Sequence, residues 1–453
     1  MALVALADFG STYTKVRLVD PGEGRLAGAG EAPTSIGTDL MEGYEDALQA
    51  ALSSAGAGAG AIHHRLAVSS AGGGLRVAAV GLVADLTAAA AKQAALNAGA
   101  RVEAVLSGAL GEEELDRLQA ARPEIVLFAG GTDGGQAELV LENARRLGER
   151  GVGGHAVVAC NAEVAEEVAA SLRAAGTEPV VAGNVMPELG RLEVESAREA
   201  MLRVFLEHVI GGKGLSASPE FERMVRLPTP EAVFEAARLL DDVVVLDVGG
   251  ATTDVHSSRS AEVAAPGIED PLLPPPLALR TVEGDLGLRA GAAGVLAADR
   301  GWIEAEAGEE AAAIRQGVSI RSENPKWLPE DERGEKLEAL LAIGCGAQAL
   351  RRHCGSMLLA RGEKGPPTLV RDGPDLREVA LFLGTGGVFA HREDGEAILW
   401  RVLGRRAPRS LAPEEPAVRV DRAYVLAAAG LLATEDPAAA ERLLRRELGL
   451  SKN

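Results

Sequence analysis

A short turn between two apolar strands constrains this chain more than any other feature, because the chain contains it twice. The first copy reads DFGSTYTK: a strand ends at Asp8, the backbone turns through Gly10, Ser11 and Thr12, and a second strand carries Lys15. Glycine lets another group approach the backbone closely. Hydroxyl groups, backbone amides and a lysine suit phosphate oxygens, and a carboxylate can hold Mg²⁺ directly or through water. Taken alone, the stretch also fits a hairpin stabilised by its aspartate.

The second copy reads LDVGGATTDV and lies 239 residues further on (247 minus 8). A five-residue apolar strand ends at Asp247. Gly249 and Gly250 then leave the backbone open to close approach by another group, and Ala251 and Thr252 follow. Two turns of this kind can bind a triphosphate from opposite sides, with the two aspartates in the coordination shell of one Mg²⁺ ion. The repetition favours a nucleotide-phosphate site over two unrelated hairpins.

Two further glycine turns follow apolar strands. LFLGTGGVFA runs from a strand through Gly384, Thr385, Gly386 and Gly387 directly into a helix, which suits a phosphate or the adenosine side of a nucleotide. Neither the Rossmann spacing G-x-G-x-x-G nor a Walker A sequence is present. The stretch LFAGGTDGG at 127–135 fits either a tight strand–helix turn or a second site for an anion or a partner.

Composition limits the kinds of partner. The 453 residues carry a formal net charge of −20, which argues against nucleic acid or an anionic membrane as the main partner. Three cysteines, Cys160, Cys345 and Cys354, provide no disulfide framework, and the histidines show no zinc-ligand spacing. No secretory signal or apolar run of about 20 residues is visible. We therefore expect a cytoplasmic protein with reduced thiols.

Hydrophobic patterning divides the chain into five segments. Residues 82–185 alternate short apolar strands with amphipathic helices, which predicts a parallel sheet covered on both faces and inserted after the first segment, 1–81. A helical connector is expected over 186–240. The segment 241–405 contains the second and third turns, and 406–453 is expected to be mostly helical.

In this order the three turns resemble the phosphate-1, phosphate-2 and adenosine motifs of the actin/Hsp70/sugar-kinase ATPase superfamily. That resemblance implies an α/β fold with two ribonuclease-H-like domains around a nucleotide cleft. A closer resemblance is to the glutamate mutase-associated MutL family, which is unrelated to the mismatch-repair protein of similar name. The blocks that carry it cover most of residues 3–390 and read ADFGSTYTK, FAGGTDGG, GNVMPELG, LPTP, LDVGGATTDVHS, TVEGDLGLR and GTGGVFA.

The family resemblance implies an ATPase that reactivates an adenosylcobalamin-dependent mutase, with ATP and Mg²⁺ as cofactors. ATP-driven domain movement would let intact cofactor replace damaged cobalamin. By motif, Asp8, Asp247 and Lys15 are the expected catalytic residues, with the two aspartates organising Mg²⁺ and the attacking water. The phosphates and adenosine are expected at Gly10, Ser11, Thr12, Lys15, Gly249, Gly250, Ala251, Thr252, Gly384, Thr385, Gly386 and Gly387. Ala251 is a departure, because many superfamily members carry Gly or Asp there.

Other functions stay open at this point. A small-molecule kinase on the same fold would need a catalytic base and a polar pocket, and a nucleotide-switched scaffold would need no turnover. An iron–sulfur activator would need Cys345 or Cys354 to bridge a dimer. The stretch TVEGDLGLR places Glu283 and Asp285 either at the start of a helix, as cap and first-turn carboxylates, or near the nucleotide, and we favour the helix cap. Oligomeric state and the particular mutase are not encoded in any motif.

Overall fold

The computed structural model describes residues 2–71, 75–151, 154–210, 214–261, 268–269, 274–360 and 368–450. The chain forms two compact units, of which the first comprises Met1–Leu18 with Ala27–Ala232 and the second Val19–Leu26 with Val233–Asn453. Among the described residues, no helix is both long enough and apolar enough to cross a membrane.

The first unit contains a five-stranded sheet built on the opening hairpin. Its order is β10-β4-β1-β2-β3, and β1 runs parallel to β4, as does β10. Nearly continuous burial along β1 and β2 explains their apolar sequences. The strands are β1 (Leu3–Phe9), β2 (Tyr13–Asp20), β3 (Arg25–Pro33), β4 (Ile62–Ser69) and β10 (Val225–Pro228). The two strands predicted on either side of the first turn are therefore confirmed.

The second unit contains a sheet of the same design. Its order is β14-β12-β11-β17-β18, with β11–β12–β14 antiparallel and β17 and β18 parallel to β11. Numbered from the first strand of each meander, both sheets read 3-2-1-4-5. The strands are β11 (Val243–Val248), β12 (Thr253–Ser258), β14 (Ala278–Glu283), β17 (Leu381–Thr385) and β18 (Ala417–Val420). This duplication confirms the predicted α/β fold with two ribonuclease-H-like domains.

Helices cover the second sheet and form most of its core. The central one is α12 (Glu332–His353), which packs against β12, α10 and α14 and is buried along most of its second half. A small sheet, β13-β16-β15, lies apart from the main one. The remaining elements are β13 (Ile268–Glu269), α10 (Ala292–Ala307), α11 (Ala311–Glu323), β15 (Ser356–Ala360), β16 (Thr368–Asp372), α13 (Gly387–Ala390), α14 (Gly395–Leu403), α15 (Val425–Leu432) and α16 (Pro437–Glu447).

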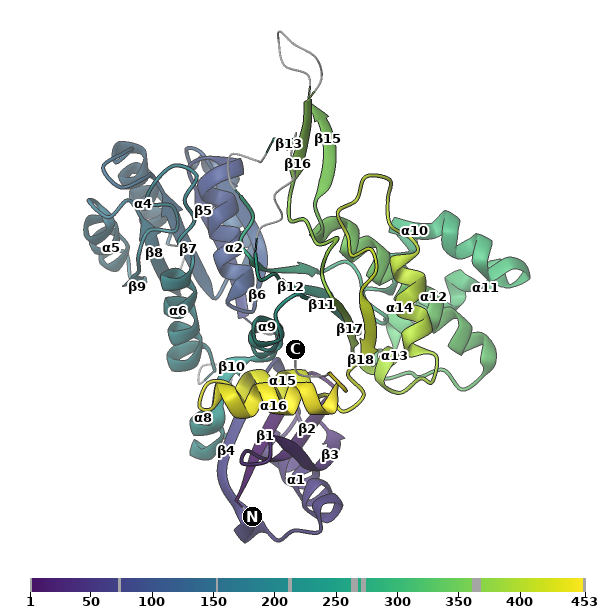
Figure 1. Cartoon of the computed structure of the whole chain (residues 1–453). Helices are drawn as coiled ribbons and strands as arrows, with labels where there is room; N and C mark the ends of the chain where they lie inside the picture. Colours follow the sequence, from purple (N-terminus) through teal and green to yellow (C-terminus); the bar gives the residue numbers. More distant parts are fainter. Residues whose placement is uncertain are drawn as a thin grey trace. The chain divides into compact units, whose positions relative to one another are not determined.

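A parallel α/β module forms the rest of the first unit. Its sheet, in the order β6-β5-β7-β8-β9, contains β5 (Leu75–Gly81), β6 (Ala100–Ser107), β7 (Ile125–Gly130), β8 (His155–Cys160) and β9 (Glu178–Val181). This is the doubly wound order 2-1-3-4-5. Figure 1 shows helices on both of its faces, as the sequence predicts.

Two groups of helices cover the module's sheet. On one face α2 and α6 pack together, and on the other α3, α4 and α5 share one apolar core with the strands. The helices are α2 (Ala89–Asn97), α3 (Glu112–Ala121), α4 (Glu138–Arg150), α5 (Ala165–Ala174) and α6 (Glu195–Val204). Elsewhere in the described part of this unit lie α1 (Leu40–Ala55) and α8 (Pro219–Met224), and α9 (Thr229–Leu240) begins in it. Two π-helical turns, η3 (Ala84–Ala88) and η4 (Phe205–Val209), precede α2 and follow α6.

Candidate functional site: a duplicated phosphate turn

The two aspartate–glycine turns have the same backbone hydrogen bond. The amide of Gly10 donates to the carbonyl of Tyr13 at 3.2 Å, and the amide of Gly249 donates to the carbonyl of Thr252 at 3.0 Å. A β-carbon added at Gly10 would lie 2.6 Å from the Tyr13 oxygen, and one added at Gly249 would lie 3.1 Å from the Thr252 oxygen. The duplicated sequence therefore folds into a duplicated turn, in which close backbone approach requires glycine at Gly10 and leaves little room for a side chain at Gly249.

The first turn is held from behind by a residue that the motif does not contain. Thr34, just after β3, donates its hydroxyl to the Gly10 carbonyl and its amide to the Thr12 carbonyl, each at 2.9 Å. The side chains of Ser11 and Thr12 are exposed at the front of the turn. Backbone bonds thus fix the turn while its hydroxyls face outward, as a preformed anion-binding loop requires.

Asp8 receives a hydrogen bond from the LPTP block. The Thr229 hydroxyl donates to Oδ1 of Asp8 at 2.7 Å, because Thr229 begins α9 directly after β10 ends. Ser69, at the end of β4, pairs in register with both Phe9 and Pro228. Its hydroxyl is buried and has no hydrogen-bond partner among the residues described. The ends of strands β1 and β10, which both pair with β4, therefore bring the Asp8 carboxylate and the Thr229 hydroxyl together, and Thr229 was missed as a site residue.

The second and third turns meet at one edge of the second sheet. Asp247 on β11 and Thr385 on β17 are register partners at the ends of these parallel strands. A β-carbon added at Gly386 would lie 2.4 Å from the Val248 oxygen and 3.4 Å from Oδ1 of Asp247. Gly386 also has a φ of +104°, and the exposed Gly387 opens α13. The structure thus brings the predicted adenosine turn beside the predicted phosphate-2 turn.

The TVEGDLGLR block supports the second turn. The amide of Arg289 donates to the Gly250 carbonyl at 2.7 Å. A β-carbon added at Gly287 would lie 2.6 Å from the carbonyl carbon of Ala251, so the two backbone segments are in contact. Ala251 itself is exposed at the front of the turn.

The expected helix-cap role of this block is wrong. The helix that follows, α10, begins only at Ala292, well beyond Glu283 and Asp285. Both carboxylates instead bind Arg352: its Nη1 lies 2.6 Å from Oε2 of Glu283 and 2.7 Å from Oδ1 of Asp285. The hydrogen bond from Arg352 lowers the pKa of Asp285. Arg352 lies at the end of α12, so the sequence around Glu283 and Asp285 gives no indication of this contact.

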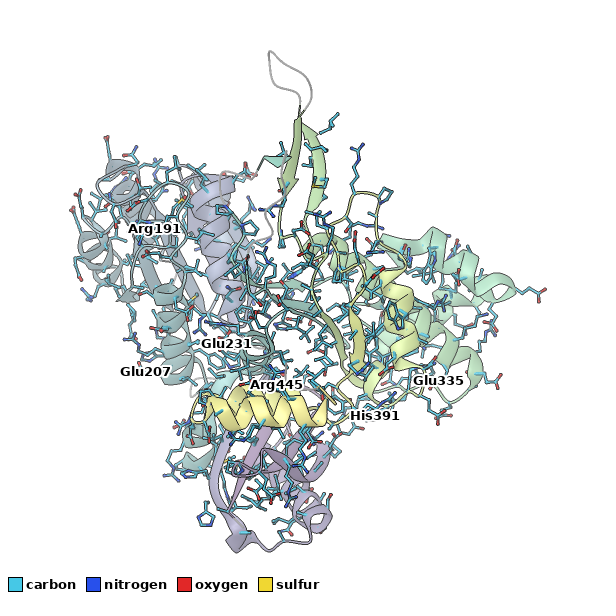
Figure 2. All side chains as sticks on the ribbon, in the orientation of Figure 1. Arg191, Glu207, Glu231, Glu335, His391 and Arg445 are labelled. Atoms are coloured by element: carbon cyan, nitrogen blue, oxygen red, sulfur yellow. The ribbon has the colours of Figure 1, made fainter. Side chains whose placement is uncertain are left out.

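A histidine–tyrosine pair flanks the third turn. A β-carbon at Gly387 would lie 3.7 Å from Cδ2 of His391 and 3.8 Å from Oη of Tyr424. Oη of Tyr424 and Nε2 of His391 are 3.0 Å apart, and the ring centroids are separated by 5.7 Å. Figure 2 labels His391. Behind the turn, buried Asp421 accepts the amides of Val425 and Leu426 at the start of α15. Flat rings beside an open glycine give this edge a surface that a nucleobase or ribose can contact.

The 127–135 glycine cluster is tied into its surroundings. Asp133 accepts a hydrogen bond from the Asn184 side chain at 2.8 Å and from the Ala162 amide at 2.9 Å. Its own amide donates to the Pro187 carbonyl at 2.9 Å. The FAGGTDGG and GNVMPELG blocks therefore lock together at the carboxyl edge of the module's sheet, which supports the tight-turn interpretation.

The cysteines are poor candidates for a cluster site. Cys160, Cys345 and Cys354 are free and buried. Burial raises the pKa of both Cys160 and Cys345 to about 12, and it raises that of Cys354 as well. Buried thiols held protonated do not offer the accessible thiolate that an iron–sulfur bridge needs.

The architecture and the duplicated turn define an α/β protein of the actin-like ATPase fold. A family model described as MutL protein matches residues 4–448. The curated "Protein MutL" of Clostridium tetanomorphum is 38% identical over 459 residues, which is 98% of each chain. The chain belongs to the MutL family, so the resemblance drawn from its motifs is confirmed.

Solved structures give looser likenesses. A glycerol dehydratase reactivase is 12% identical with a TM-score of 0.37, and the match covers 95% of this chain and 99% of that one. Component A of the (R)-2-hydroxyglutaryl-CoA dehydratase of Acidaminococcus fermentans is 9% identical with a TM-score of 0.32, over 97% and 100%.

Proposed function

We propose that this chain is a Mg-ATP-dependent ATPase that reactivates an adenosylcobalamin-dependent mutase of the glutamate mutase type. The observation that supports it most is the repeated turn, with an aspartate at the end of the first strand of each 3-2-1-4-5 sheet and the same amide–carbonyl bond after it. Membership of the MutL family supports the mutase as partner.

In this proposal both turns bind phosphate groups of ATP. The hydroxyls and amides of Ser11 and Thr12, with Lys15, would bind phosphate oxygens from the first unit, and Gly249–Thr252 would do so from the second. The Gly384–Gly387 turn, with the ring pair of His391 and Tyr424 beside it, would contact adenosine. Phosphoryl transfer to water needs positioning and charge neutralisation more than covalent chemistry, and these groups supply both.

The aspartates fit a magnesium ion by their chemistry. Asp8 and Asp247 are half-buried carboxylates at strand ends beside glycine backbone and hydroxyl groups, and Mg²⁺ prefers one or two carboxylates together with waters and phosphate oxygens. The ion would neutralise phosphate charge. Thr229 orients the Asp8 carboxylate, since its hydroxyl donates to Oδ1 and leaves Oδ2 for water or metal.

The test is ATP hydrolysis by Asp8→Ala and Asp247→Ala, with Asp46→Ala on the exposed surface of α1 as matched control. Each site variant is expected to lose ATP turnover while keeping its unfolding temperature, and the control to keep both. Unchanged turnover in the two site variants would refute the site. Phosphate transfer to a small acceptor would instead identify a kinase, and nucleotide-dependent polymers without turnover would identify a scaffold.

A further inference from the structure

A cluster of side chains at the amino-terminal edge of the module's sheet has no role in the proposed ATP site. His155 is the first residue of β8 and Glu178 the first residue of β9, and the two are register partners on parallel strands. Because side chains alternate along a strand, and Ala156 and Val158 lie in the core shared with α3, α4 and α5, His155 projects from the opposite face. Glu178 projects from that face too.

A second histidine reaches this face from a distant part of the chain. Helix α6, which packs on β8, continues into the π-helical turn η4, and His208 belongs to that turn. π-helical turns inside helices are rare and frequently occur at functional sites. The chain has only seven histidines, and two of them meet here although 53 residues separate them (208 minus 155).

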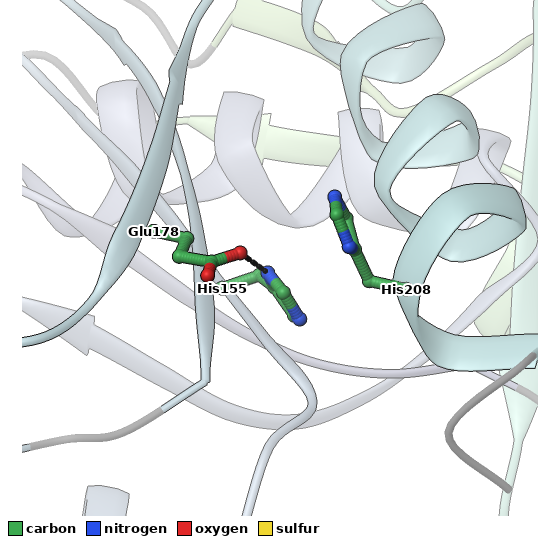
Figure 3. A group of neighbouring side chains, drawn as sticks. All are labelled: His155, Glu178 and His208. Carbon is green, nitrogen blue, oxygen red and sulfur yellow. Dashed lines mark ion pairs between the residues drawn. The ribbon is translucent and has the colours of Figure 1, made fainter.

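The three side chains converge, as Figure 3 shows. Nδ1 of His155 lies 3.4 Å from Oε2 of Glu178, and the rings of His155 and His208 are stacked with centroids 4.5 Å apart and planes inclined by 19°. One ligand-type atom from each residue lies within 4.8 Å of those from the other two.

We propose that His155, Glu178 and His208 form a binding site for a divalent transition-metal ion such as Zn²⁺. Two imidazoles and one carboxylate are a donor set that zinc accepts, and three protein ligands leave a position open for water or a partner's side chain. Zinc bonds of about 2.1 Å place neighbouring ligand atoms roughly 3.3 Å apart, so the three atoms must draw together and the rings must turn out of their stack.

The exposure of the three groups permits that movement. The side chains of Glu178 and His208 are 72% and 40% exposed, whereas that of His155 is only 21% exposed and is fixed by its place on the strand. Oε2 of Glu207 lies 3.7 Å from Nε2 of His208, which leaves Nδ1 of that ring for the metal. Metal-bound imidazoles usually give their second N–H to a carboxylate, and Glu207 is placed to accept it once the two groups draw closer than 3.7 Å.

The experiment uses the full chain, stripped of metal with a chelator and titrated with Zn²⁺ in competition with a chromophoric zinc indicator. We expect one zinc ion per chain, with affinity reduced at least tenfold in His208→Ala and in Glu178→Gln. His64→Ala is the matched control, because that exposed histidine lies on β4, and it is expected to bind as the wild type does. Cys160, buried in the same module with a raised pKa, adds no thiolate background.

Substitution with Co²⁺ gives an independent readout of coordination. The wild-type chain is expected to give the visible absorption of a four- or five-coordinate nitrogen and oxygen site, and the His208→Ala chain to lose it. If the wild-type chain binds Zn²⁺ no more tightly than His208→Ala, the proposal is overturned. The cluster would then be a histidine stack with an ion pair that binds no metal. An equal loss of affinity in the His64→Ala control would overturn it too. Neither readout depends on ATP turnover, so failure here leaves the proposed function untouched.

Discussion

The hydrogen bond from Thr229 to Asp8 gives the sharpest prediction for catalysis. Thr229→Val keeps the shape of the side chain but removes the hydroxyl that donates to Oδ1 of Asp8 at 2.7 Å. Thr229→Ser keeps the hydroxyl and is the matched control. If Asp8 organises the metal and the attacking water, the valine variant holds a carboxylate that is no longer fixed in direction.

The expected size of the effect follows from the charge on the acceptor. A hydrogen bond to a charged group contributes about 1.5–3 kcal/mol. At about 1.4 kcal/mol for each factor of ten, losing it in the transition state lowers the turnover rate roughly ten- to hundredfold. Because Thr229 is not expected to touch ATP, kcat is expected to fall while KM changes little.

The assay is phosphate release from Mg-ATP under saturating and limiting nucleotide. Thr229 also begins α9, so the unfolding temperatures of both variants are measured first, to separate a misfolded chain from a misoriented carboxylate. Turnover by Thr229→Val within twofold of the wild type, with the serine variant equally active, would refute the role given to this contact and weaken the assignment of Asp8.

Two further predictions concern stability. Gly386→Ala is expected to destabilise the second unit by about 2–5 kcal/mol, because φ is +104° and the new β-carbon would lie 2.4 Å from the Val248 oxygen. Gly387→Ala, whose nearest neighbour is 3.7 Å away, is the control in the same thermal unfolding experiment, and equal losses in the two would contradict the geometry. Burial, reinforced by Arg259, lowers the pKa of His353 from 6.5 to about 3. Since the unfolded chain takes up this proton first, stability is full above pH 6.5 and falls by about 1.4 kcal/mol per unit as the pH drops toward 3. His353→Gln is expected to flatten the pH dependence of the urea midpoint, and an unchanged slope would contradict it.

Much of the fold could be predicted because its signals are local. The opening strands, the repeated turn at Asp247, the strand–glycine–helix at Gly384–Gly387 and the alternating module all depend on residues near one another in the sequence. Apolar periodicity and glycine positions encode such elements directly.

The contacts that complete the site depend on residues far apart in the chain. Thr229 and Asp8 are 221 residues apart in the sequence. The LPTP block that contains Thr229 reaches the site because β10 joins the first sheet. Arg352 likewise forms ion pairs with Glu283 and Asp285, which lie far from it in the sequence. This is why the local helix-cap interpretation failed. Strand order creates the Thr229–Asp8 pair, and the packing of α12 against β14 creates the Arg352 pairs. Neither can be recognised within a window of neighbouring residues.

The most direct measurement of the central claim is reactivation itself. A glutamate mutase-type enzyme blocked with hydroxocobalamin is mixed with this chain, Mg-ATP and free adenosylcobalamin, and the recovered mutase activity is followed. We expect recovery with ATP and none with a non-hydrolysable analogue or with the Asp8→Ala chain. Recovery that proceeds equally with Asp8→Ala, or its absence with the wild-type chain and the mutase it accompanies, would contradict the account.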